Sequence, residues 1–291
     1  MKYLVVKGWL GFGDRLESLK MGIEYALQYN LQIYVDWTDS IWSHEAESFY
    51  TYFNLVNMPT LKSLDEIPED ATVFPSYWQG KLNTPMSQDL CNKHKEYKLD
   101  VGQLTKPLSG DVIVLANVGM RTLYEDSRKF ANYFRVIDSR ILNAVRERTQ
   151  KYNLAKCMGI HIRGTDRVKN EYKRQLGIQC LAVNTMMHGG FSGKGMICVS
   201  DDKDSYELWK RFYPQTILMS SASLECSSSK GNHNLSKEDL KISKDDMNVD
   251  MLVDFFTLAS CELVLRTYRD SRFAKEAIRL HPYVNMILTN S

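Results

Sequence analysis

The stretch CMGIHIRGTDR, residues 157–167, passes from an apolar run directly into a cluster of charged side chains. A short apolar run that ends at a charge and a glycine is typical of a buried strand. Ligands of open parallel sheets bind beyond the carboxyl ends of the strands. The stretch therefore predicts a strand at Cys157–Ile162 whose end opens onto a ligand site.

The chain that follows alternates between expected helices and strands. The sequence predicts helices at 175–187, 204–212, 249–260 and 271–280, and strands at 195–200, 216–219, 262–265 and 283–288. Residues 138–152 before it are expected to form a helix capped by Asp138 that bridges two domains. Residues 220–248 are polar and indicate a surface loop or lid. Such alternation is typical of an α/β domain with a parallel sheet.

The beginning of the chain repeats this pattern. A strand at 3–6, a glycine-rich turn at 8–13 and a strand at 31–37 surround a run with leucine and isoleucine at helical spacing. Asp14 is placed to cap that helix. Residues 38–110 carry five of the seven prolines and indicate long loops, before another buried strand at 111–117. We therefore expect two domains, 1–140 and 141–291, which form two facing Rossmann-like units with a cleft between them.

Composition excludes several classes of protein. The net charge is only +2 over 291 residues, and the sequence contains no basic stripe. Both observations argue against a nucleic-acid partner. No stretch reaches the roughly 20 apolar residues of a membrane span, so we expect no integral membrane segment. The first residues are too short an apolar run for a signal peptide, and the six cysteines are scattered without a metal-binding spacing. These features predict a cytoplasmic protein with reduced thiols.

Charged side chains follow three of the expected strands. Asp201 and Asp202 come after the strand at 195–200, while Arg266, Arg269 and Arg272 follow the strand at 262–265. Together with Arg163 they form an arginine-rich edge next to expected helix starts, which suits phosphate. The alternative is that charges simply collect in solvated loops.

Four segments in order resemble a known superfamily. HIRGTDRVKNE (161–171) resembles the HxRxTDKVxxE segment of the core α1,6-fucosyltransferases. GFGDRL (11–16) followed by IYVDW (33–37) is similar to the rhizobial nodulation fucosyltransferases. VSDD (199–202), and DFFTLAS (254–260) with Thr267-Tyr268, resemble the second and third motifs of these enzymes. The resemblance covers most of residues 1–280 and implies the GT-B fold, with an N-terminal acceptor-side domain and a C-terminal nucleotide-sugar domain.

The resemblance also implies roles for individual residues. Arg163 matches the arginine that binds the donor diphosphate, and His161 and Asp254 match residues that contact the base. Glu171 matches the proposed catalytic base, and we group Asp166 with it and Arg163 as catalytic. The remaining candidates for donor binding are Gly11, Gly13, Asp201, Asp202, Thr267, Arg269, Ser271 and Arg272. The implied reaction transfers fucose from GDP-fucose to a glycan hydroxyl, with inversion and without a metal or other cofactor.

Two departures from the family pattern leave the donor open. Gly164 stands where related enzymes often carry a second basic residue, and residues 269–272 (RDSR) replace a serine-rich turn. UDP-xylose or a GDP-linked deoxysugar are therefore alternative donors. Sulfotransfer would need a lysine in the phosphate loop near the first strand, and Gly8–Asp14 has none. A carbohydrate-binding protein without catalysis is the non-enzymatic alternative.

Each candidate also has a purely structural interpretation. His161 could be a core histidine, Asp254 a buried ion-pair partner, and Glu171 an ordinary acid at a helix start. Gly11 and Gly13 could serve only the turn. The remaining ambiguity concerns Trp37 and Trp42, which belong either to the core or to a platform for a sugar ring.

Overall fold

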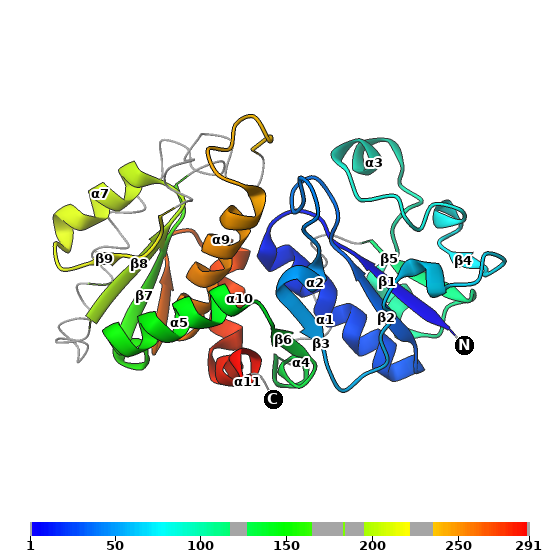
Figure 1. Ribbon diagram of the computed structural model, residues 1–291, viewed down its shortest axis with the longest axis horizontal. Coiled ribbons are helices and arrows are strands. Elements are labelled where there is room, and N and C mark those ends of the chain that lie inside the picture. Colours follow the sequence, from blue (N-terminus) through cyan, green and yellow to red (C-terminus); the bar gives the residue numbers. More distant parts are fainter. Residues whose placement is uncertain (1, 117–126, 165–182, 184–194, 222–234, 290–291) are drawn as a thin grey trace. The chain divides into compact units, whose positions relative to one another are not determined.

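The structure is a computed structural model that describes residues 2–116, 127–164, 183, 195–221 and 235–289. Contacts divide the chain into two compact units. Unit 1 comprises Met1–Asp138 together with the end of the chain from Asn285, and unit 2 comprises Ser139–Val284. Each unit is built on its own parallel sheet (Figure 1).

The sheet of unit 1 has the strand order β2-β1-β5-β4, and all of its strands are parallel. Its strands are β1 (Tyr3–Lys7), β2 (Gln32–Asp36), β4 (Val73–Phe74) and β5 (Val112–Leu115). The long helix α1 (Phe12–Tyr29) packs closely on β1 at Gly22. The approach is so close that a Cβ atom on Gly22 would lie 2.5 Å from the Val6 side chain. This is the expected strand–turn–helix–strand unit.

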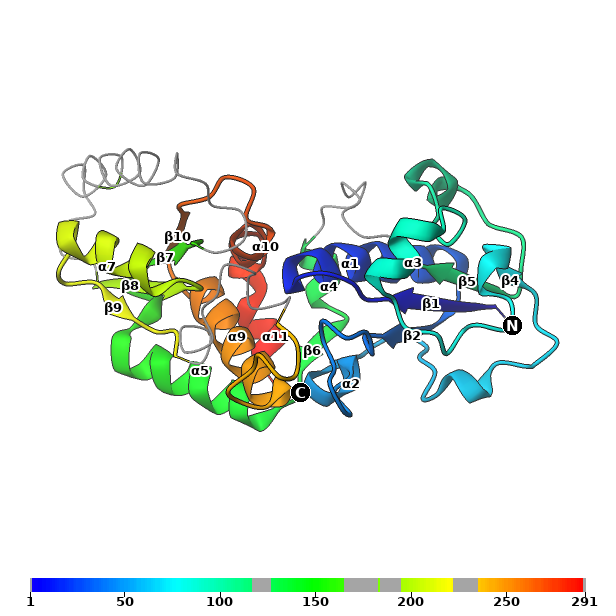
Figure 2. The same ribbon diagram turned by 90° about the horizontal axis from the view of Figure 1, so that it is seen from above.

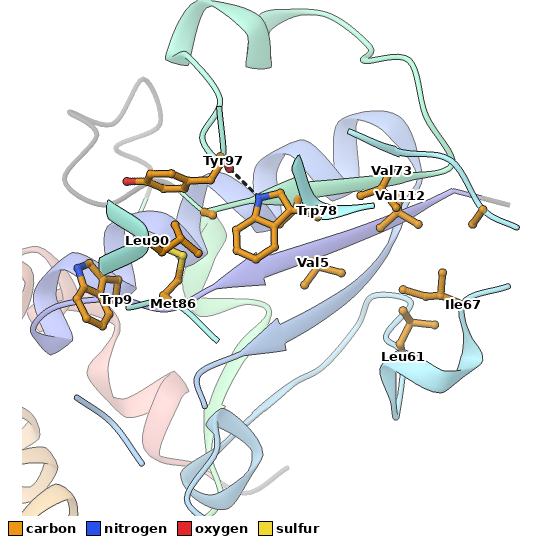
Figure 3. Packing of buried hydrophobic residues seen from close by; sticks show 13 residues of the cluster. Val5, Trp9, Leu61, Ile67, Val73, Trp78, Met86, Leu90, Tyr97 and Val112 are labelled. Carbon is orange, nitrogen blue, oxygen red and sulfur yellow. Dashed lines mark hydrogen bonds between the residues drawn. The ribbon is translucent and has the colours of Figure 1, made fainter. Parts of the chain in front are cut away.

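The segment that the sequence left poorly defined forms short elements around this sheet. They are α2 (Phe49–Tyr52), β3 (Phe53–Leu55), α3 (Gln88–Lys93), α4 (Ser127–Ala131) and β6 (Phe134–Val136). β3 pairs antiparallel with β6 in a separate two-stranded sheet. Trp78 belongs to the buried cluster that packs residues of the segment 61–97 against β1 and β5, and its indole N–H donates to the Tyr97 carbonyl at 2.7 Å (Figure 3).

Two buried cations lie at the end of β1 and the start of α1. The Lys7 ammonium contacts Asp36 and two backbone carbonyls, those of Leu82 and Thr84. Arg15 binds Asp39 in bidentate fashion at 2.7 and 2.8 Å and lies against the rings of Trp37 and Trp42. Both tryptophans are almost fully buried, so they belong to the core and do not offer a platform to a sugar.

The sheet of unit 2 has the order β10-β7-β8-β9 and is also parallel throughout. Its strands are β7 (Cys157–Ile162), β8 (Gly195–Ser200), β9 (Ile217–Leu218) and β10 (Leu263–Arg266). Figure 2 shows α7 (Lys203–Phe212) and α5 (Ser139–Tyr152) on opposite faces of this sheet. The helices α9 (Lys244–Ala259) and α10 (Arg272–Leu280) pack against each other, and α5 packs on α9.

Three predictions of local structure are wrong, one of them in part. The helix α9 begins at Lys244 after its N-cap Ser243, so the last five residues of the expected surface loop 220–248 are helical. Residues 283–288 form a helix, α11 (Val284–Leu288), after a 3-10 turn at His281–Tyr283, and no strand. Val284 and Ile287 are both buried, and their spacing of three residues places them on one helical face. The N-cap of α1 is Gly11, so Asp14 lies in the first turn and does not cap the helix. Its charge there still favours the positive end of the helix dipole.

Candidate functional site

The ends of three strands of unit 2 lie in register. His161 of β7 pairs with Val199 of β8 on one side and with Arg266 of β10 on the other. Because parallel strands end at the same edge of a sheet, the residues that follow them converge. The structure therefore brings together Arg163, Asp201 and Thr267, as the sequence predicted.

Arg163 is held from both neighbouring strands. Its backbone N–H donates to the Thr267 hydroxyl at 3.2 Å, and its Nε atom lies 3.3 Å from a carboxylate oxygen of Asp201. The Thr267 N–H in turn donates to the His161 carbonyl at 3.0 Å. The arginine side chain is 20% exposed and that of Asp201 14%. A guanidinium in this half-buried position is suited to a phosphate ligand.

Gly164 has no room for a side chain. Its N–H donates to Asp201 at 2.7 Å, which brings its backbone against the start of α7. A Cβ atom here would lie 2.3 Å from the Cβ of Asp202 and 2.6 Å from the Ser205 hydroxyl. Asp202 is the N-cap of α7 and accepts the Ser205 N–H at 2.8 Å. The glycine that departs from the family pattern is thus required by the packing of this turn.

His161 is a buried, neutral histidine. The ring is 5% exposed, lies against the ring of Phe273, and shares a hydrogen bond of 3.2 Å with the Ser271 hydroxyl. Burial, together with the nearby charge of Arg163, lowers the pKa of His161 to about 3. The described contacts therefore match the core interpretation, while the predicted contact with a base remains a prediction.

Asp254 lies in a buried ion-pair network, in agreement with its structural interpretation, although the sequence did not identify its partner. One carboxylate oxygen accepts from Arg148 of α5 at 2.8 Å, and the other accepts from the Ser220 hydroxyl. Arg148 also donates to Thr257 at 3.1 Å and to the Met219 carbonyl at 2.9 Å. Burial raises the pKa of Asp254 to about 6, and the charge of Asp250 adds to the shift while Arg148 opposes it.

The helix start at α10 supplies the other candidates. Ser271 caps α10 by accepting the Ala274 N–H at 3.4 Å, so its hydroxyl serves both the cap and His161. Arg272 is the first residue of the helix, and burial lowers its pKa. Arg269 is exposed in the turn before the helix. The positive end of the α10 dipole and two arginines therefore lie at the same edge as Arg163.

The remaining candidates lie outside the described residues of unit 2. Gly11 and Gly13 belong to unit 1, at the start of α1. Asp166 and Glu171 lie outside the described residues, as do the predicted helix at 175–187, apart from Val183, and part of the polar segment 220–248. Within the described ranges, no group of three His, Cys, Asp or Glu side chains could hold a metal ion. Nor is any described helix both long and apolar enough to cross a bilayer.

With two α/β units on parallel sheets, the chain has the fold of the GT-B class, as the likeness to solved structures of that class shows. The chain is similar in structure to the fucosyltransferase NodZ from Bradyrhizobium, with a TM-score of 0.70 and 17% identity over 96% of this chain and 93% of that chain. It is similar to NodZ alpha-1,6-fucosyltransferase soaked with GDP-fucose (TM-score 0.69, 18% identity, 99% and 93% covered). A third similar structure is an Arabidopsis thaliana FUT1 mutant in complex with GDP (TM-score 0.56, 13% identity, 96% and 68% covered).

No protein-family model and no curated protein matches the sequence. The likeness to the fucosyltransferases is therefore a likeness of fold, at sequence identities of 13–18%.

Proposed function

We propose that this protein is a glycosyltransferase that moves a sugar, with fucose favoured, from a nucleoside diphosphate to a glycan hydroxyl. The proposal rests on the position of Arg163. Contacts with Thr267 and Asp201 hold this arginine at the carboxyl edge of the unit 2 sheet, where α7 and α10 begin. The N-termini of helices bind anions, and a guanidinium adds a bidentate charge. In the similar structures with GDP or GDP-fucose, the same fold serves a nucleotide diphosphate or its sugar.

Negative charge develops on the departing diphosphate during transfer. Arg163 and the two helix N-termini would stabilise this charge more strongly in the transition state than in the ground state. The acceptor hydroxyl is a weak nucleophile and needs a base, for which Glu171 is our candidate, with Asp166 beside it in the sequence. A single displacement of this kind inverts the sugar carbon, and cationic side chains would neutralise the leaving group without a metal.

The base of the donor is the least constrained part of the proposal. A carboxylate can accept from N1–H and the exocyclic amine of guanine together, whereas uracil offers one N–H between two carbonyls. Both oxygens of Asp254 already have a protein partner, so a base would have to share them with Arg148 and Ser220. We favour GDP-fucose, and UDP-xylose or a GDP-linked deoxysugar remain the alternatives.

Ligand-dependent unfolding tests the donor directly. The purified protein is heated with GDP, UDP, GDP-fucose or UDP-xylose, since a ligand at 100 times its dissociation constant adds about 2.7 kcal/mol of stability. We expect stabilisation by GDP and GDP-fucose that Arg163→Ala removes, and transfer of labelled fucose to a glycan acceptor by the wild type. If UDP binds more tightly than GDP, the proposed donor changes from GDP-fucose to a UDP-sugar such as UDP-xylose. A folded Arg163→Ala variant with normal turnover would refute the role of the arginine.

Turnover separates the enzyme from a carbohydrate-binding protein. Binding of glycans without any consumption of nucleotide sugar would favour the second function.

A cytoplasmic location is part of the proposal and rests on the scattered cysteines. Four of them are described, and all four are free thiols.

A further inference from the structure

We propose that Asp201 and Thr267 are positioning residues, which fix Arg163 for the diphosphate and do not themselves contact the donor. The inference rests on the proposed function, because it names how the arginine of that site is held. Both residues were expected from the sequence to bind the donor, but the observed bonds give them a different task.

The two residues act on Arg163 from opposite sides. Thr267, at the end of β10, accepts the backbone N–H of Arg163 and bonds to the end of β7 through its own N–H. Asp201, at the end of β8, pairs with the Nε atom and so restrains the side chain. One residue fixes where the chain leaves the sheet, and the other fixes the direction of the guanidinium.

Asp201 is itself anchored by the neighbouring backbone. One carboxylate oxygen accepts the Gly164 N–H at 2.7 Å, and the other faces Arg163. Because Gly164 has no side chain, this turn can lie close to Asp202 at the end of β8. A carboxylate that serves a backbone N–H and an arginine at once is well placed to orient that arginine, and poorly placed to serve as a ligand of a nucleoside.

The contact to Nε also agrees with phosphate chemistry. The Nη atoms form the end of the guanidinium fork that faces away from the side-chain stem, and a phosphate binds that end in bidentate fashion. Pairing at Nε therefore orients the fork from the side of its stem. Loss of the pair should weaken diphosphate binding through misplacement of the arginine, since small displacements of a positioned group are costly.

A double-mutant cycle on ligand affinity tests this role. Calorimetry measures binding of GDP, inorganic pyrophosphate and guanosine to Asp201→Asn, which keeps an acceptor for Gly164 but removes the charge. We expect GDP and pyrophosphate to bind about tenfold more weakly and guanosine to bind unchanged. In an Arg163→Ala background, Asp201→Asn should have no further effect. Asp204→Asn is the control, because it removes an exposed charge three residues further on, in the first turn of α7.

Thr267 offers a second, milder pair of variants. Thr267→Val loses the hydroxyl at nearly constant shape and should behave like Asp201→Asn, whereas Thr267→Ser keeps the hydroxyl and should stay within about twofold of the wild type. An equal loss of GDP affinity with and without Arg163, or a parallel loss of guanosine affinity, would overturn the proposal. If Asp201→Asn does not fold, the Thr267 variants decide the question alone.

The unliganded protein separates this inference from the proposed function. Unfolding of wild type, Asp201→Asn, Arg163→Ala and the double variant gives the coupling between the two side chains without any ligand. If the effect of Asp201→Asn on the unfolding constant is about threefold or more larger with Arg163 present than with Arg163→Ala, the pairing is supported. If the two effects are the same, the pairing is refuted. If the wild type binds none of the nucleotides, the proposed function fails, and this cycle still decides whether Asp201 holds Arg163.

Discussion

Replacement of Gly164 by alanine is the sharpest test of how the site is packed. The added Cβ would lie 2.3 Å from the Asp202 Cβ, 2.5 Å from a carboxylate oxygen of Asp202 and 2.6 Å from the Ser205 hydroxyl. Ordinary contacts begin near 3.4 Å, so the turn after β7 and the start of α7 must separate by about 1 Å. The nearest atom belongs to the stem of a short side chain, which cannot swing away.

The cost has two parts. Forcing an extra methyl group into a packed site costs about 1–3 kcal/mol. Movement of Asp202 also breaks the N-cap of α7, a bond of 2.8 Å to the Ser205 N–H, and loss of such a cap costs about 1 kcal/mol. We therefore expect Gly164→Ala to lower the free energy of unfolding by about 2–4 kcal/mol, and to weaken GDP binding because Asp201 and Arg163 move with the turn.

Urea unfolding measures this loss, with the same slope expected for variant and wild type. Gly102→Ala is a matched control, since nothing lies within 4 Å of its added Cβ and no left-handed backbone is involved. Its stability should stay within about 0.5 kcal/mol of the wild type. Asp202→Gly should restore part of the loss in Gly164→Ala, because it removes the nearest atoms. Wild-type stability in Gly164→Ala would refute the packing argument.

Three further outcomes are expected. The folded-state pKa of His161, about 3, lies below the ordinary histidine pKa of 6.5. Its contribution to stability is therefore complete above pH 6.5 and is lost as the pH falls, by about 1.4 kcal/mol per pH unit. Urea unfolding at pH 7 and pH 5 should show this loss in the wild type and not in His161→Phe. Arg148→Ala leaves the Asp254 carboxylate buried without its cation and should cost about 3–5 kcal/mol, part of which Asp254→Asn in the same chain restores. Transfer activity should persist in excess EDTA, and an activity that EDTA abolishes and Mn²⁺ restores would contradict the metal-free mechanism.

The order of the main elements followed from the sequence because apolar runs and helical spacing are local signals. The strands at the core of both sheets and helices α1, α5, α7 and α10 lie close to their expected ranges, while α9 begins five residues earlier than expected. The apolar run at 283–288 could not be assigned in this way, because a short buried helix and a buried strand have the same composition. The many short elements between β2 and β5 depend on tertiary contacts and left no periodic signal.

The site was predictable in outline and not in its bonds. The charged residues after β7, β8 and β10 converge because parallel strands end at one edge, which is a rule of topology. Which of them bind one another depends on side-chain direction, so the pairing of Asp201 with Arg163 was missed. Asp254 was considered as an ion-pair partner, but its cation, Arg148, was not identified. One signal was present: Arg148 continues the buried stripe of Ile141 and Val145 on α5. A charge at a core position of a helix should have prompted a search for its partner.

The strand order of unit 2 has a consequence during synthesis on the ribosome. β7 lies inside the sheet, β8 pairs along one side of it, and β10, made about 100 residues later, closes the other side. A nascent chain that has emerged only as far as α7 holds both Arg163 and Asp201, but it lacks the Thr267 hydroxyl that receives the Arg163 N–H. One edge of β7 then stays open to pairing with other chains. The site would be the last part of unit 2 to assemble, and release of an incomplete chain would favour aggregation over partial activity.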